Sequence, residues 1–257
     1  MKSWLRYMEN RPPLLGSTIL VTRPEPQAKK LAERLAGLGA KVVSMSVIEI
    51  VPIKAEVWPK IAFEKQDMIV FVSRNAVACF VAEMPALLSP TTRLVAVGAA
   101  TARCMVEKGL RVDIQAPAPA GSESLLALAA MKSVAGQAVL IVRGETGREL
   151  LADTLKARGA RIEYLEVYRR CLPDYTAEEV AQALTADIIV ITSVAGLENL
   201  CQIVGNAEIK QKVLLVVSER IRQFAEELGF QHIAVTDDVS DTALVHQMIK
   251  IGQNNGE

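Results

Sequence analysis

Residues that several kinds of function need are scarce in this sequence. Aromatic side chains make up 4% of its 257 residues, which argues against the stacking platforms that bind single-stranded nucleic acid. The 29 basic and 29 acidic residues cancel, whereas a nucleic-acid-binding domain is usually strongly basic. No apolar run approaches the roughly 18 residues that a membrane span needs. We therefore expect no nucleic-acid partner and no membrane association.

Disulfide pairs, metal ligands and targeting segments are also missing. With only two histidines, His232 and His246, we expect no metal site. Residues 1–16 lack the apolar stretch and cleavage site of a secretory signal, and we expect them to form a frayed extension. The cysteines have no C-x-x-C spacing, which indicates reduced thiols in a cytoplasmic protein; they are Cys79, Cys104, Cys171 and Cys201.

The most informative feature of the sequence is an internal repeat. Shifted by 120 residues, the sequence aligns with itself without gaps in three separate blocks. Chance similarity between two α/β units is the alternative, but one register holds through all the blocks. A period this long excludes a solenoid and indicates two related domains. The matching blocks are Leu20–Val47 with Leu140–Val167, Asp67–Ser73 with Asp187–Ser193, and Leu94–Gly109 with Leu214–Gly229.

Strand and helix patterns alternate along each half. A helix is predicted over Glu25–Leu38, with Gly39 as its C-cap. Alternation of this kind implies α/β architecture with parallel sheets covered on both faces, and five strands per half suggest a flavodoxin-like, doubly wound unit. The predicted strands are Thr18–Thr22, Lys41–Ser46, Asp67–Val72, Arg93–Val97 and Arg111–Gln115, then Ala138–Val142, Arg161–Leu165, Asp187–Ile191, Lys212–Val217 and Gln231–Thr236.

Small, polar or cationic residues follow the carboxyl ends of these strands, where ligands bind in such folds. Hydroxyls and the free N–H groups of helix N-termini suit an anionic ligand. Any single Ser or Thr at such a position can also be an ordinary helix N-cap, worth about 1 kcal/mol. The candidate binding residues are Arg23, Ser73, Gly98, Thr101, Ser122, Arg143, Gly144, Ser193 and Ser218.

Several short strings occur in an order and spacing typical of one family. They are Ile19–Pro24, Leu38–Ala40, Phe71–Val77, Val97–Thr101, Ser122–Leu126, Val142–Gly144, Arg158–Ala160 and Val167–Arg169. Together they resemble uroporphyrinogen-III synthase, and the resemblance runs from about Ser17 to His246.

The resemblance implies an enzyme of tetrapyrrole biosynthesis. Such an enzyme closes the linear tetrapyrrole hydroxymethylbilane into uroporphyrinogen III, losing water and inverting the terminal pyrrole ring through a spiro intermediate. The family uses no metal or organic cofactor, so we expect none here. Its members have two flavodoxin-like domains joined by a two-strand linker, with the active site in the cleft between them. We expect a cytoplasmic monomer with hydroxymethylbilane as its small-molecule partner.

The resemblance also changes the expected domain boundaries. The repeat taken alone suggests sequential domains near 17–136 and 137–257. In the family the chain instead crosses over twice, so that each half gives its first two strands to the last three of the other. One expected domain is then 1–49 plus 171–257 and the other is 53–166, with linkers at 48–52 and 167–171.

Tyr168 is the candidate catalytic acid, because family members carry a tyrosine in the same Val-Tyr context. Its repeat equivalent is Ile48, so symmetry of the two halves does not require an aromatic ring there. The alternative is that Tyr168 only shields the linker strands.

The other candidate residues also have structural alternatives. Arg23 and Arg143 are equivalent under the repeat, and each could pair with the nearby Glu25 or Glu145 to fix a turn. Four other residues are expected to donate hydrogen bonds to the ligand through their hydroxyl or backbone N–H groups: Ser73, Thr101, Ser122 and Ser193. Ser218 replaces the glycine that the family pattern has at its turn, and we expect it to cap a helix.

Two other functions fit part of the sequence. A two-lobed, non-enzymatic sensor or binding protein for an anionic small molecule would explain the repeat and the polar strand ends, but not the family strings. A flavodoxin-like redox protein would need aromatic residues around the flavin and a Ser/Thr-rich phosphate loop, and the sequence has neither. Gly144–Arg148 also lacks the spacing of a Walker A loop.

Overall fold

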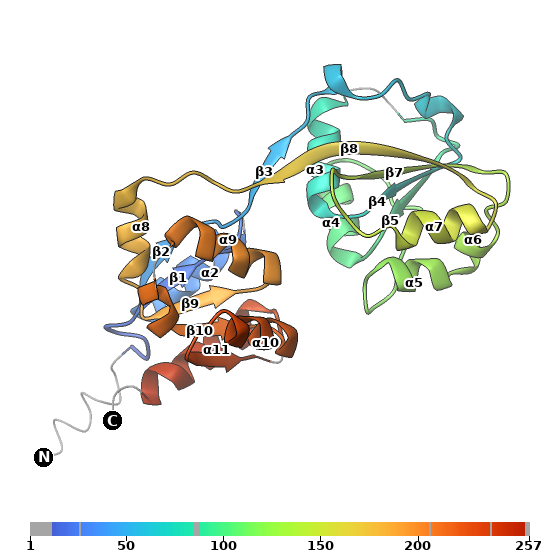
Figure 1. The fold of residues 1–257 in the computed structure, drawn as a ribbon. Coiled ribbons are helices and arrows are strands. Elements are labelled where there is room, and N and C mark those ends of the chain that lie inside the picture. Colours follow the sequence, from blue (N-terminus) through green and yellow to red (C-terminus); the bar gives the residue numbers. More distant parts are fainter. Residues whose placement is uncertain (1–11, 26, 85–87, 206, 237, 255–257) are drawn as a thin grey trace, which may run out of the picture. The chain divides into compact units, whose positions relative to one another are not determined.

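The structure, a computed structural model, describes residues 12–25, 27–84, 88–205, 207–236 and 238–254 of the chain (Figure 1). The chain divides into two units: Met1–Glu49 with Leu172–Glu257, called unit 1, and Ile50–Cys171, called unit 2. Each unit contains one sheet with its own helices. None of the helices in the described part of the chain is long and apolar enough to cross a membrane.

Unit 1 contains a parallel sheet of five strands. In chain order these are β1 (Thr18–Val21), β2 (Lys41–Ser44), β9 (Ile188–Ile191), β10 (Val213–Val216) and β11 (His232–Val235). They lie side by side as β11-β10-β9-β1-β2, so β1 pairs with a strand from the other end of the sequence. Short apolar runs such as β9, buried along its whole length, are typical of parallel strands covered on both faces.

Helices cover both faces of this sheet. Alternate residues of β1 point to opposite faces: Leu20 joins the core beneath α8 (Ala177–Leu184), α9 (Val194–Val204) and α10 (Glu219–Glu227). Ile19 and Val21 join the core beneath α2 (Gln27–Gly37) and α11 (Asp241–Asn254). The three-layer arrangement predicted from the strand and helix patterns is therefore present in unit 1.

The segment before β1 differs from the sequence prediction. Leu14 is only 1% exposed and packs in the core between α2 and α11, and its N–H donates to the carbonyl of Leu38 at 3.1 Å. Gly39 has φ of +89°, and a Cβ there would lie 2.7 Å from that of Pro12, which supports its predicted role at the helix end. The expectation of a frayed extension is thus wrong for residues 12–16, and residues 1–11 lie outside the described part.

Unit 2 contains a sheet of six strands in the order β3-β8-β7-β4-β5-β6. The pairs that link β4 through β8 are parallel. The strands are β3 (Glu49–Pro52), β4 (Met68–Phe71), β5 (Arg93–Ala96), β6 (Ile114–Gln115), β7 (Ala138–Gly144) and β8 (Arg161–Cys171).

Two strands of unit 2 differ from the predicted lengths. β6 is shorter than predicted, because the carboxylate of Asp113 accepts the N–H of Leu94 at 2.7 Å and also pairs with Arg111 at 3.0 Å. β8 continues to Cys171. Residues 49–52 of the expected linker 48–52, and the whole of the expected linker 167–171, therefore lie in strands of the second sheet. The N–H of Ile53 donates to the carbonyl of Val167 at 2.9 Å.

Two groups of helices cover the sheet of unit 2. On one face α3 (Arg74–Glu83) and α4 (Ala99–Glu107) pack on the sheet, together with an aromatic cluster in which Trp58 stacks on Phe80 with ring centroids 6.0 Å apart. On the other face lie α5 (Ser122–Ala127), α6 (Ala129–Lys132) and α7 (Leu150–Ala157). No core cluster of the described residues contains side chains from both units.

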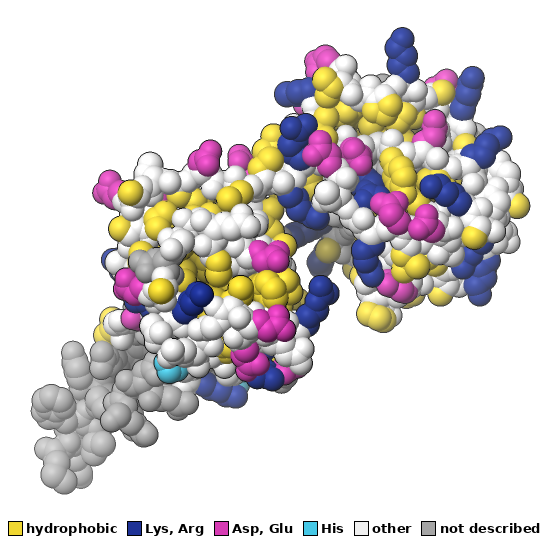
Figure 2. All heavy atoms as spheres, viewed as in Figure 1, with side chains coloured by type: hydrophobic (Ala, Val, Ile, Leu, Met, Phe, Trp, Pro, Cys, Tyr) yellow, Lys and Arg dark blue, Asp and Glu magenta, His cyan; other side chains and the backbone are white. Residues whose placement is uncertain are grey.

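The surface agrees with the balanced composition. On the face that Figure 2 shows, acidic and basic side chains are interspersed over both units. The four cysteines are free thiols, as predicted.

Candidate functional site

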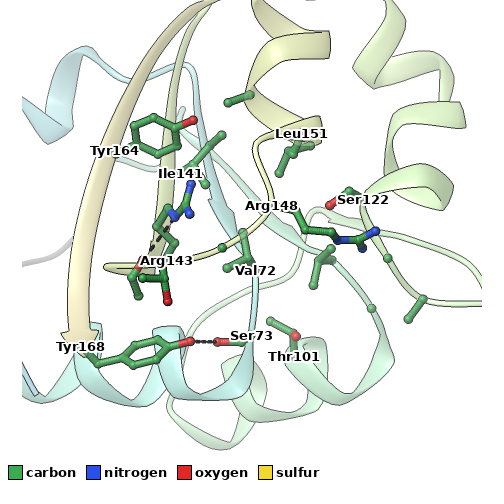
Figure 3. Close-up of a pocket in the computed structure, with 18 of the residues that line it drawn as sticks. Val72, Ser73, Thr101, Ser122, Ile141, Arg143, Arg148, Leu151, Tyr164 and Tyr168 are labelled. Atoms are coloured by element: carbon green, nitrogen blue, oxygen red, sulfur yellow. Dashed lines mark hydrogen bonds between the residues drawn. The ribbon is translucent and has the colours of Figure 1, made fainter. Parts of the chain in front are cut away.

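A cavity of about 350 Å³ lies in unit 2 where strands end and helices begin (Figure 3). The residues around it come from the β4–α3, β5–α4 and β7–α7 junctions, from the segment before α5, and from β8. This is the edge of a parallel sheet at which ligands bind in doubly wound folds. Of the residues predicted from the sequence, the cavity is lined by Ser73, Gly98, Thr101, Ser122, Arg143, Gly144 and Tyr168.

The remaining predicted residues, Arg23, Ser193 and Ser218, belong to unit 1. Ser193 and Ser218 are N-caps of α9 and α10, with hydroxyls that accept backbone N–H groups at 3.0 and 3.4 Å. Arg23 is buried and donates to the carboxylate of Asp241 at 2.7 Å and to the carbonyl of Val239 at 2.6 Å. The suggested Glu25 partner of Arg23 is therefore wrong, because the residue that reaches it comes from the start of α11.

Tyr168 lies on β8 opposite Gly144, at a bulge that interrupts the pairing between β7 and β8. A Cβ on Gly144 would come within 2.7 Å of ring atom Cε2, so only glycine leaves room for the ring. Tyr168 is only 2% exposed. The ring is held firmly, and its hydroxyl lies 3.4 Å from the Ser73 hydroxyl (Figure 3).

The serine and threonine hydroxyls of the cavity differ in what they already bind. The Ser73 hydroxyl accepts the N–H of Ala76 at 3.0 Å and so caps α3. Thr101 and Ser122, in the first turns of α4 and α5, make no side-chain hydrogen bond to any described residue and line the cavity. These two hydroxyls are therefore available to a ligand, whereas that of Ser73 is partly used.

Gly98 brings two loops together beside these hydroxyls. A Cβ on Gly98 would lie 2.4 Å from the Cβ of Ala120, so the segment before α5 can approach the start of α4 only because residue 98 has no side chain. Gly98 thus shapes the cavity wall, a role that explains its presence in the Val97–Thr101 string.

Arg143 fixes the loop between β7 and α7. Its side chain is only 8% exposed and forms an ion pair with Glu149 at 2.7 Å, and its Nε donates to the carbonyl of Gly144 at 3.2 Å. A Cβ on Gly147 would lie 2.8 Å from its Nη2 atom, so the loop wraps closely around the guanidinium. The suggested Glu145 partner is wrong, because Glu145 pairs with Arg169 at 3.2 Å instead.

Tyr164 completes this group. Its ring lies 5.0 Å from the Arg143 guanidinium, and its hydroxyl donates to the second carboxylate oxygen of Glu149. Burial, followed by the hydrogen bond to Glu149, raises the pKa of Tyr164 to about 12. The hydrogen bonds from Tyr164 and Arg143 lower the pKa of Glu149. Arg143, Glu149 and Tyr164, called the loop clamp below, therefore favour a charged carboxylate and a protonated phenol.

Among the lining residues that sequence reasoning did not select are two arginines and a second tyrosine: Arg148, Arg170 and Tyr164. Arg148 belongs to the same polar loop as Arg143, and it pairs with Glu123 at 2.7 Å. Arg170 follows Tyr168 by two positions on one strand, a spacing that places both on one face. The strand predicted over Arg161–Leu165 continues to Cys171. A prediction with that longer strand would have placed Arg170 beside Tyr168.

The electrostatics of the cavity favour an anionic ligand. Its lining contains three arginines, and none of the described lining residues is an Asp or Glu. The described residues contain no group of three or more His, Cys, Asp or Glu that could hold a metal ion. The arrangement offers cations and hydroxyls to bind carboxylates and one buried phenol that can donate a proton.

Comparisons with known proteins point to one family. The family model described as "Uroporphyrinogen-III synthase HemD" matches residues 29–246. A uroporphyrinogen-III synthase of Escherichia coli (strain K12) is 33% identical over 246 residues, which cover 90% of this chain and 99% of the relative. That of Salmonella typhimurium (strain LT2) is 34% identical over 250 residues, with coverage of 90% and 99%. The fold is shared with the crystal structure of uroporphyrinogen-III synthetase from Helicobacter pylori 26695, at a TM-score of 0.65 and 14% identity over 91% of this chain and 99% of that one.

Proposed function

Because the chain belongs to the uroporphyrinogen-III synthase family, we infer that it cyclises hydroxymethylbilane to uroporphyrinogen III, with loss of water and inversion of the terminal ring. It is an enzyme, a lyase of porphyrin and haem biosynthesis. The observation that supports this site is the cavity of unit 2. Seven of the residues predicted from the sequence, including Arg143, line it together with Arg148 and Arg170. The named relatives are synthases, which favours the enzyme over a non-enzymatic binding protein.

The charge of the cavity suits the substrate. Hydroxymethylbilane carries carboxylates on every ring, and the arginines of the cavity and the free hydroxyls of Thr101 and Ser122 are donors for such groups. Holding the two ends of the linear chain together can supply on the order of 7 kcal/mol of the barrier. Proton donation adds roughly 10²–10⁴-fold. We therefore assign most of the acceleration to folding of the substrate.

Tyr168 is the proposed acid. In the first step the C–O bond of the hydroxymethyl group breaks, and both electrons leave with the oxygen, which takes the Tyr168 proton and departs as water. The azafulvene cation that remains is attacked by the substituted carbon of the terminal ring. The spiro intermediate fragments and recloses with that ring reversed, and a proton lost from the ring carbon restores the phenol. The buried ring and its hydroxyl at the cavity support this role.

We also propose that the two units are flavodoxin-like domains, derived from one repeat of about 120 residues, that have exchanged their first two strands and are joined through β3 and β8. When the strands are numbered by their position in each repeat, their spatial order within the two sheets is the same: β11-β10-β9-β1-β2 in unit 1 corresponds to β6-β5-β4-β7-β8 in unit 2. Their registers support this as well. Leu20 pairs with Ile189 in unit 1 and Leu140 with Ile69 in unit 2, which are equivalent positions under the shift.

A side-chain contact repeats in the same way. The N–H of Thr18 donates to the carboxylate of Asp187 at 2.8 Å, and the equivalent N–H of Ala138 donates to that of Asp67 at 2.8 Å. Each aspartate directly precedes the third strand of the repeat, and its carboxylate binds the N–H group at the start of the first strand of the repeat in the same sheet. Such a correspondence is expected when both units descend from one ancestral domain.

We propose that the enzyme is a cytoplasmic monomer that acts without metal or organic cofactor and without nucleic acid. Free thiols are typical of a reducing compartment, and the absence of net charge argues against a nucleic-acid partner.

A coupled assay tests the function. The purified enzyme is supplied with freshly generated hydroxymethylbilane, and the uroporphyrinogen isomers are separated after oxidation. We expect accelerated formation of the type III isomer. Formation of only the unrearranged type I isomer, at the rate without enzyme, would contradict the proposal.

A further inference from the structure

Arg170 makes the closest cationic contact with the proposed acid among the described residues. Its Nη2 atom donates a hydrogen bond to the Tyr168 hydroxyl at 3.3 Å. Its guanidinium carbon also lies 5.7 Å from the centroid of the Tyr168 ring. Both residues line the cavity, so this contact is made at the site and not behind it.

Arg170 differs from the other arginines of the cavity in its partners. Arg143 is paired with Glu149, and Arg148 with Glu123. Arg170 forms no ion pair with any residue that the structure describes, and its hydrogen bond and its ring contact are both with Tyr168. Its guanidinium is therefore not committed to a carboxylate of the protein.

The direction of this hydrogen bond constrains the Tyr168 proton. A guanidinium only donates, whereas a phenol oxygen accepts and also has one proton to give. While Arg170 donates to the oxygen, the phenol proton must point away from Arg170. The ring cannot turn aside, because it lies against Gly144. Among the described residues, the other hydrogen-bonding neighbour of the hydroxyl is Ser73 at 3.4 Å, on the cavity wall.

We propose that Arg170 is a positioning residue: it holds the phenol oxygen as an acceptor so that the Tyr168 proton points into the cavity. This inference rests on the proposed function, with Tyr168 as the acid. A mobile hydroxyl would spend part of its time with the proton directed away from the departing oxygen, and the proton-transfer step would slow. A group that orients the acid acts on the chemical step more than on substrate binding.

The neighbouring arginine offers a matched control. Arg169 precedes Arg170 on the same strand, is exposed, and pairs with Glu145 rather than with Tyr168. Arg169→Gln and Arg170→Gln therefore remove the same charge from adjacent positions. We expect Arg170→Gln to lower kcat about tenfold, as the loss of one charge-assisted hydrogen bond would, with KM changed less than about twofold. Arg169→Gln should leave kcat unchanged, and Arg170→Lys, which retains a donor, should recover most of the loss.

A double-mutant cycle with Tyr168→Phe tests whether Arg170 acts through the phenol. In the Phe background, Arg170→Gln should cause little further loss, since there is no hydroxyl left to orient. An equal loss in both backgrounds, or a rise in KM with kcat retained, would show that Arg170 binds substrate instead and would overturn the proposal. Equal activities of the two Gln variants would overturn it as well.

Failure of this inference is distinct from failure of the proposed function. If wild-type protein forms no type III isomer, the function is wrong and the role of Arg170 with it. If the wild-type protein is active but Tyr168→Phe keeps full kcat, the function stands and the positioning role is overturned. Because the side chains of Arg169 and Arg170 are exposed and Tyr168→Phe keeps the buried ring, all these variants should fold, which an unchanged melting temperature will verify.

Discussion

Tyr168 combines two parts that can be changed separately. Its ring fills a space in the core of unit 2, while its hydroxyl faces Ser73 and Arg170 in the cavity. Stability depends on the ring and the proposed chemistry on the hydroxyl.

Tyr168→Phe keeps the ring and removes the proton donor. We expect turnover to fall by roughly tenfold or more, within the range that general acids contribute, while the free energy of unfolding changes by about 1 kcal/mol at most. Tyr168→Ala should lose about 3–5 kcal/mol of stability, as for other buried aromatic residues. Isomer analysis and denaturant unfolding measure the two effects. Wild-type turnover in the Phe variant would leave Tyr168 with a structural role only.

Gly144 is the residue that makes room for this ring. Gly144→Ala places a Cβ 2.7 Å from Cε2 and 2.8 Å from Cζ of Tyr168, so the ring or the strand must move. Overpacking of this kind costs about 1–3 kcal/mol, and turnover should fall with it because the hydroxyl shifts.

Gly37→Ala is the control for this substitution. Gly37 is the last residue of α2, and no atom lies within 4 Å of its added Cβ. We expect that variant to be neutral or up to about 1 kcal/mol more stable. Denaturant unfolding of both variants checks the pair, and equal stabilities would contradict the close contact at Gly144.

Among the elements, the loop between β7 and α7 is held in place by side-chain contacts. The loop clamp holds it through one buried arginine, one carboxylate and one phenol. Arg148 lies on this loop and reaches the cavity, so the position of a cavity cation depends on the clamp.

The clamp predicts a pH dependence on the alkaline side. The folded pKa of Tyr164 is raised to about 12, above the ordinary phenol value near 10, so the folded state binds this proton more tightly than the unfolded chain does. Its contribution is fully present below about pH 10 and is lost as the pH rises towards 12. Wild-type protein should therefore lose more stability than Tyr164→Phe between these values. Parallel losses, measured by denaturant unfolding at each pH, would contradict the prediction.

At the scale of the whole molecule, the two units have separate apolar cores in the described residues. Leu14 contributes to a core of unit 1, whereas Trp58 lies in unit 2, where it stacks on Phe80 and donates to the carbonyl of Ile53 at 2.9 Å. A core substitution in unit 1 can therefore be combined with a fluorescent reporter in unit 2 to test whether the two units unfold separately.

Leu14→Ala should destabilise unit 1 by about 2–5 kcal/mol. Leu15→Ala is the control, because Leu15 is 49% exposed and a change there should stay within about 0.5 kcal/mol. In a Trp4→Phe background, where Trp58 is the remaining tryptophan, we expect Leu14→Ala to shift unfolding followed by circular dichroism while the fluorescence transition of Trp58 keeps its midpoint. A joint shift of both transitions would show that the two units unfold together.

Local patterns determined much of this protein. The apolar runs, the helix periodicity and the 120-residue repeat predicted parallel α/β architecture, because strand and helix signals depend on neighbouring residues. Ser73, Ser193 and Ser218 could be predicted as caps for the same reason, since an N-cap binds an N–H group about three residues away. The strings that resemble the family implied its chemistry, and they contain half of the residues that line the cavity.

The tertiary structure decided which distant residues meet. Arg143 pairs with Glu149 rather than Glu145, because the loop folds back over the guanidinium. Arg170 lies beside the Tyr168 hydroxyl, because β8 continues past the bulge to Cys171. β1 pairs with β9 although their partner residues, such as Leu20 and Ile189, lie 169 positions apart in the sequence. The free energies of such contacts depend on burial and geometry that no local pattern contains, so sequence periodicity could predict the strands but not their partners.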